Sequence, residues 1–174
     1  MIGFLRVDRT QVRINTFNHV AGVDYDPRVP AVTCSTLRSG RACLASWNGR
    51  IEIDAVYRLF DEVRRGRDEA GVRLLLICVI PDSTGLPPPS IRSALVGALP
   101  ALMSCCEAIF VVLHGGDRRR ELFRALLGCP RITTYLGAAV QVFENQEAAL
   151  AAARSMAPND VLALQYLALH QRRT

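Results

Sequence analysis

The chain contains no lysine, and all 21 of its basic residues are arginines. With 16 acidic residues they give a formal net charge of +5. Arginine suits phosphate and nucleic acid, yet these arginines are dispersed, often beside acids, and only residues 118–120 form a run. Aromatic residues are scarce and do not alternate with arginine, as a base-stacking platform requires. We therefore expect no nucleic-acid partner.

Long apolar runs and metal-binding spacings are also missing. No stretch reaches the ~20 apolar residues that cross a bilayer, and residues 1–13 lack the apolar core of a signal peptide. The six cysteines form neither C-x-x-C nor a cysteine/histidine spacing typical of zinc sites. We expect small core cysteines in a cytoplasmic protein, with no membrane span, no metal and no cofactor. The cysteines are Cys34, Cys43, Cys78, Cys105, Cys106 and Cys129.

Half of the 174 residues are hydrophobic, enough for one sizeable core. We divide the chain into an N-terminal arm at 1–30, an α/β domain at 31–157 and a C-terminal helix at 158–174. The arm has two candidate short strands, 1–7 and 11–17, followed by a proline- and glycine-containing loop. Whether it packs on the domain, swaps to a partner copy or moves freely stays open at this point.

Strand and helix patterns alternate along the domain, after a hairpin with a turn at 38–41. This order predicts an α/β fold with a mixed, largely parallel sheet flanked by helices, its antiparallel edge supplied by the hairpin. The predicted strands are 32–37, 42–47, 72–80, 108–113 and 138–143. The predicted helices are 54–65, 88–103, 118–127, 145–156 and 158–171.

Capping residues set the expected ends of these helices. Asp54 is predicted to cap the first helix, and Gly66 to end it in the left-handed conformation. Pro100 is expected to kink or end the second helix. The last helix is apolar on two sides, so it is either deeply buried or packed on a partner, and self-association through it is one of our predictions.

The most informative stretch runs from 72 to 89. Its apolar strand stops at Pro81, a polar turn Asp82-Ser83-Thr84-Gly85 follows, and three prolines then lead into a helix. Open α/β sheets place ligands and switches where a buried strand meets a loop and a helix N-terminus. The same residues also suit a plain turn, in which the hydroxyls bond amides and glycine supplies a positive φ.

The element order, together with Asp82-Ser83-Thr84-Gly85-Leu86, resembles the STAS domain and the broader SpoIIAA-like group. That family includes anti-sigma-factor antagonists and bacterial stress-signalling proteins. The resemblance covers residues 33–156 and implies phosphorylation by a partner kinase at the hydroxyl before the glycine, here Thr84, with Ser83 beside it. Two features depart from the family pattern: Pro81 before the loop, and the triple proline after it.

The resemblance implies a non-enzymatic signalling module that binds a regulatory kinase or an anti-sigma-like factor. The expected contact loop comprises Asp82, Gly85 and Leu86, with Arg92 in the following helix. A phosphate there would add about −1.5 to −2 charges beside a helix N-terminus, which favours anions.

A second loop supports an alternative function. His114, Gly115 and Gly116 precede Arg118, and two glycines before a helix can hold an anion on backbone amides. The alternative is a domain that binds a small anionic or lipid-like ligand between the two loops, with Arg118 or Arg92 as charge partner. Nucleotide signatures are missing here, and no catalytic constellation emerges. A structural subunit that forms homodimers is the third hypothesis.

Overall fold

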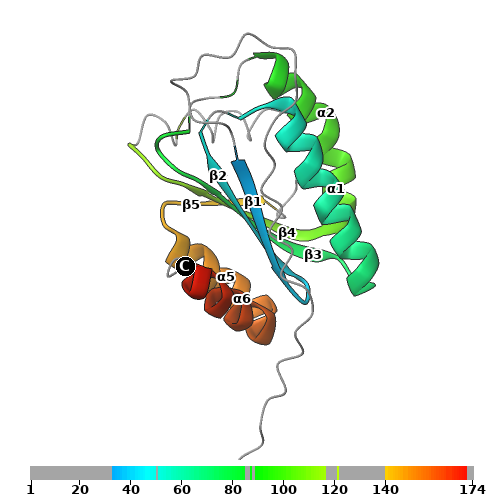
Figure 1. Ribbon diagram of the computed structural model, residues 1–174, viewed down its shortest axis with the longest axis vertical. Helices are drawn as coiled ribbons and strands as arrows, with labels where there is room; N and C mark the ends of the chain where they lie inside the picture. Colours follow the sequence, from blue (N-terminus) through cyan, green and yellow to red (C-terminus); the bar gives the residue numbers. More distant parts are fainter. Residues whose placement is uncertain are drawn as a thin grey trace, which may run out of the picture.

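The computed structural model describes residues 33–49, 51–84, 87, 89–116, 121 and 140–171. The predicted arm 1–30, the predicted helix 118–127, Cys129 and part of the predicted strand 138–143 lie outside these residues. The described chain forms an α/β layered structure around one five-stranded sheet (Figure 1). None of its described helices is long and apolar enough to cross a membrane.

The strands lie side by side in the order in which they occur in the chain. The first two pair antiparallel, and every later neighbouring pair is parallel. The predicted hairpin and the predicted mixed, mostly parallel sheet are therefore confirmed. The strands are β1 (Thr33–Ser39), β2 (Ala42–Asn48), β3 (Leu74–Ile80), β4 (Cys106–Leu113) and β5 (Val140–Phe143).

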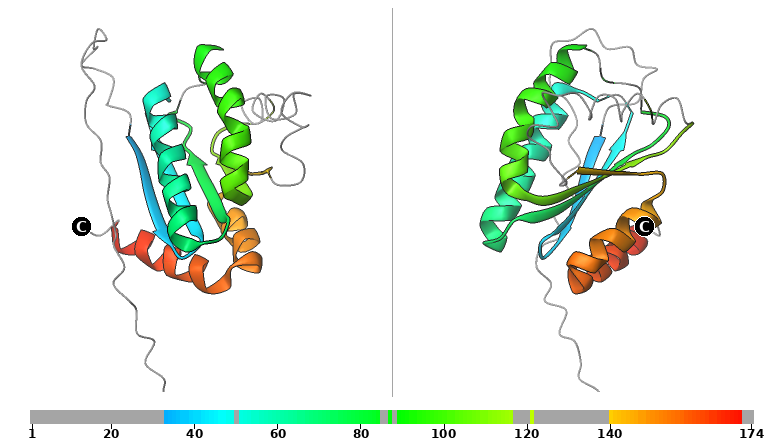
Figure 2. Two further views of the ribbon diagram at one scale, coloured as in Figure 1. Left: turned by 90° about the vertical axis from the view of Figure 1, so that its right-hand side faces the viewer. Right: turned by 180° about the vertical axis from the view of Figure 1, so that it is seen from behind.

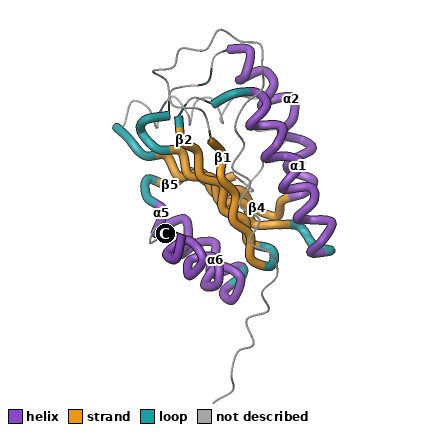
Figure 3. The backbone as a smooth tube through the Cα atoms, viewed as in Figure 1, coloured by secondary structure: helices purple, strands orange, loops and turns teal. Residues whose placement is uncertain are grey.

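Among the described residues, two helices cover each face of the sheet. On one face lie α1 (Ile53–Ala70) and α2 (Pro89–Cys105), and on the other lie α5 (Gln146–Met156) and α6 (Pro158–Gln171), as Figures 2 and 3 show. The predicted cap of α5 is confirmed, because the Asn145 side chain accepts a 2.8 Å hydrogen bond from the Ala148 amide.

The alternation of side chains along the strands creates two cores. In β3, Leu74 and Leu76 belong to the core under α1 and α2, whereas Leu75 and Ile77 belong to the core under α5 and α6. All four have no exposed surface. This explains why β3 reads as an unbroken apolar run, since a strand covered on both faces needs apolar residues at every position.

Both predicted ends of α1 are wrong. Asp54 lies in the first turn and Glu52 occupies the N-cap position, while the helix ends at Gly71, whose φ is 68°. Gly66 is buried inside the helix, where an added Cβ would lie 3.0 Å from Leu74 Cδ1. Arg38 from the hairpin donates a 3.1 Å bond to the Gly66 carbonyl, so this glycine makes room for a neighbour and does not stop the helix.

Of the two effects expected of Pro100, a kink or an end of the helix, the end is wrong, because α2 continues to Cys105, past Pro100. Its position is solvent-exposed, so water can satisfy the carbonyl whose helical partner proline removes. β4 then starts at Cys106, before the predicted residue 108. Its register shifts opposite Leu74 and Leu75, which leaves Glu107 as an extra, bulged residue.

Candidate functional site

The candidate site lies at the edge where the parallel strands end. β3 and β4 are parallel, and their last paired residues are Ile80 and Leu113. The His114 amide donates a 3.1 Å hydrogen bond to the Ile80 carbonyl. The loop that follows β3 and the loop that follows β4 therefore leave the sheet next to each other, as a parallel arrangement predicts.

The loop after β3 begins with a closed turn. The Thr84 amide donates a 3.0 Å hydrogen bond to the Pro81 carbonyl, which folds residues 81–84 back on themselves. Asp82 and Ser83 are exposed, whereas Thr84 is only 1% exposed. The two adjacent hydroxyl residues thus differ sharply in access to solvent. Gly85 and Leu86 lie outside the described residues, and the buried Pro87 follows them.

The helix after this turn presents a positive end. Its first turn holds no acidic residue, and Arg92 is the one charged residue in its sequence. Arg92 is partly buried. Free amides and the helix dipole give an N-terminus partial positive charge, and Arg92 adds a full charge within the first turns. A negatively charged group placed at the start of α2 would therefore not be repelled by any carboxylate of this helix.

The loop after β4 provides a second set of backbone groups. His114 is partly buried, Gly116 is exposed, and Gly115 has a φ of 115°, a conformation that favours glycine. An added Cβ at Gly116 would meet no atom within 4 Å. Arg118, the predicted charge partner for an anion here, lies outside the described residues.

Four of the described thiols are poorly suited to nucleophilic chemistry. Burial raises the pKa of Cys34, Cys43 and Cys106 to about 12, and raises that of Cys78 well above its usual value. A thiol of such high pKa stays protonated at neutral pH, whereas the thiolate is the reactive form. Among the described residues, no three His, Cys, Asp or Glu side chains are grouped as a metal site would require.

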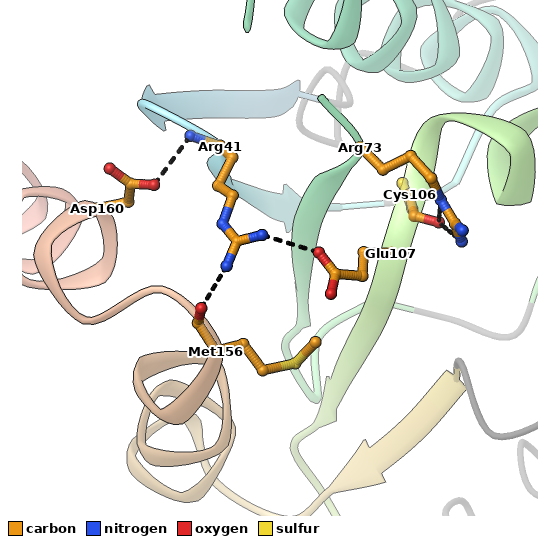
Figure 4. Close-up of polar contacts among 6 residues, drawn as sticks. All are labelled: Arg41, Arg73, Cys106, Glu107, Met156 and Asp160. Atoms are coloured by element: carbon orange, nitrogen blue, oxygen red, sulfur yellow. Dashed lines mark hydrogen bonds and ion pairs between the residues drawn. The ribbon is translucent and has the colours of Figure 1, made fainter. Parts of the chain in front are cut away.

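At the opposite edge of the sheet, Arg41 joins three elements (Figure 4). Its guanidinium bonds Glu107 on the β4 bulge at 2.9 Å and also the Met156 carbonyl at the end of α5. Its backbone amide donates to Asp160 of α6 at 3.2 Å. Nearby, Arg73 Nε donates a 2.9 Å bond to the Cys106 carbonyl. The charged and polar groups of this cluster are bonded to one another, so we assign the cluster a structural role: it holds the hairpin, β4, α5 and α6 together.

Nothing in the local sequence pattern indicated this cluster. Arg41 follows the hairpin turn and Asp160 opens the last helix, so each reads as an ordinary turn or cap residue on its own. The two lie 119 positions apart. Their pairing depends on the packing of α6 beneath the hairpin, which a single sequence without an alignment does not reveal.

No protein-family model and no curated protein sequence matches this chain. Membership of the STAS family, which residues 82–86 suggest, therefore remains a proposal.

Proposed function

We propose that the chain is a STAS-like, non-enzymatic regulatory module that binds a protein partner through the turn after β3 and the start of α2. The partner class is a regulatory kinase or an anti-sigma-like factor. The observation that carries the proposal is the exposed pair Asp82 and Ser83, followed by buried Thr84, at the carboxyl end of the central strand. Phosphorylation of this turn switches the contact.

Electrostatics at the turn support a switch of this kind. A phosphate brings about −1.5 to −2 charges and three strong acceptor oxygens. The α2 N-terminus carries Arg92 and no acid in its first turn, so the fold tolerates the added charge. A partner that approaches the turn meets a surface of changed sign, while the folded domain keeps its structure.

Burial ranks the two candidate acceptors. The resemblance assigns the phosphate to Thr84, but this side chain is 1% exposed, whereas Ser83 is exposed. A kinase must hold the acceptor hydroxyl in its own active site, so Ser83 is available in the folded turn and Thr84 requires the turn to open. We propose Ser83 as the first acceptor, with Thr84 modified after opening.

The strand order favours a protein-binding surface over a small-molecule crevice. In doubly wound sheets, small ligands bind where the strand order reverses. The described strands follow one another without such a reversal. The alternative, an anionic ligand held between the Asp82 turn and the His114 loop, is supported by the adjacency of these loops. It predicts chemical-shift changes at both loops when inorganic phosphate is titrated, before any modification.

The test is phosphopeptide mapping of the protein purified from its own cells, in growth and in stress, followed by measurement of partner binding. We expect phosphate on Ser83 or Thr84 in at least one condition. We also expect Ser83→Glu to change the affinity for the co-purified partner by about 10-fold or more, because a charge placed in a contact surface costs at least that much.

Ser104→Glu is the matched control, since Ser104 is an exposed serine in the last turn of α2, at the end of the helix away from the proposed contact. It adds the same charge outside the turn and should leave binding unchanged. Thr84→Val, which removes the hydroxyl and nearly keeps the shape, separates the two acceptors. An unmodified turn in both conditions, with complete peptide coverage and unaltered binding by Ser83→Glu, rules out the proposed switch.

A further inference from the structure

We draw no further inference here: the strongest candidate, the exposed apolar face of α6 formed by Leu162, Tyr166 and Leu169, carries none, because nothing in the structure shows what covers it.

Discussion

At the scale of single residues, Gly40 shows how tightly the hairpin turn meets α6. Its φ is 52°, in the left-handed region, and an added Cβ would lie 2.3 Å from Asp160 Oδ1. That carboxylate also accepts the Arg41 amide. Any side chain at position 40 therefore carries backbone strain and also displaces the group that anchors the last helix.

Three glycine-to-alanine variants separate these effects. Gly40→Ala should lower the free energy of unfolding by about 2–4 kcal/mol, from left-handed strain plus a lost charge-assisted hydrogen bond. Gly71 has a similar left-handed φ of 68°, but a Cβ added there would meet no atom within 4 Å. Gly71→Ala should therefore lower the free energy of unfolding by about 1–2 kcal/mol, from backbone strain alone. Gly97→Ala, in α2 with open space around it, should stabilise by up to about 1 kcal/mol.

Urea denaturation of the three variants and the parent chain measures these differences. If Gly40→Ala costs no more than Gly71→Ala, the contact between position 40 and Asp160 does not constrain the turn.

At the scale of elements, Arg41 connects the hairpin to both β4 and α5. Arg41→Ala should cost about 2–3 kcal/mol, mainly through the partly buried bond to the Met156 carbonyl, since exposed ion pairs contribute little. Arg41→Lys should recover little of the loss, because an ammonium does not span both acceptors as a guanidinium does.

Arg64→Ala is the control for this prediction. Its ion pair with Asp61 has both side chains about two-thirds exposed (66% and 70%), so a change within about 0.5 kcal/mol is expected. If Arg41→Ala and Arg64→Ala lower the free energy of unfolding equally, the bonds of Arg41 stabilise the fold no more than an exposed ion pair does.

The elements themselves were predictable from the sequence where the pattern is local. β3 is a continuous apolar run, and the hairpin follows alternation around a glycine turn, so both appear near their predicted positions. The end of α1 was not predictable from local sequence. Gly66 makes room for the side chain of Arg38, which lies 28 positions earlier and donates a hydrogen bond to the Gly66 carbonyl. The position of the candidate turn followed from the β3 run, but the burial of Thr84 beside exposed Ser83 depends on tertiary packing.

At the scale of the whole molecule, buried thiols couple stability to alkaline pH. Burial raises the pKa of Cys43 from 9.0 to about 12. Between these values the unfolded chain releases a proton that the folded chain keeps. Stability is therefore fully present below about pH 9 and falls as the pH rises toward 12, by about 1.4 kcal/mol per pH unit for each such thiol.

The chain suits this measurement because it lacks lysine, so thiols and tyrosines are the side chains that ordinarily titrate in this window. Urea unfolding from about pH 8 to about pH 11 should show the decline, and Cys43→Ala should make the slope shallower by one thiol. Identical slopes for the parent chain and the variant would exclude a contribution from Cys43.

The position of α5 and α6 after the five described strands has a consequence for synthesis on the ribosome. These helices cover the sheet face that includes Leu44, Leu75, Ile77, Phe110 and Val112. Translation proceeds at about 5–20 residues per second, so the strands precede their cover by an interval on the order of seconds. During that time the nascent chain displays a broad apolar surface. Its emergence is the stage at which this protein most needs a chaperone.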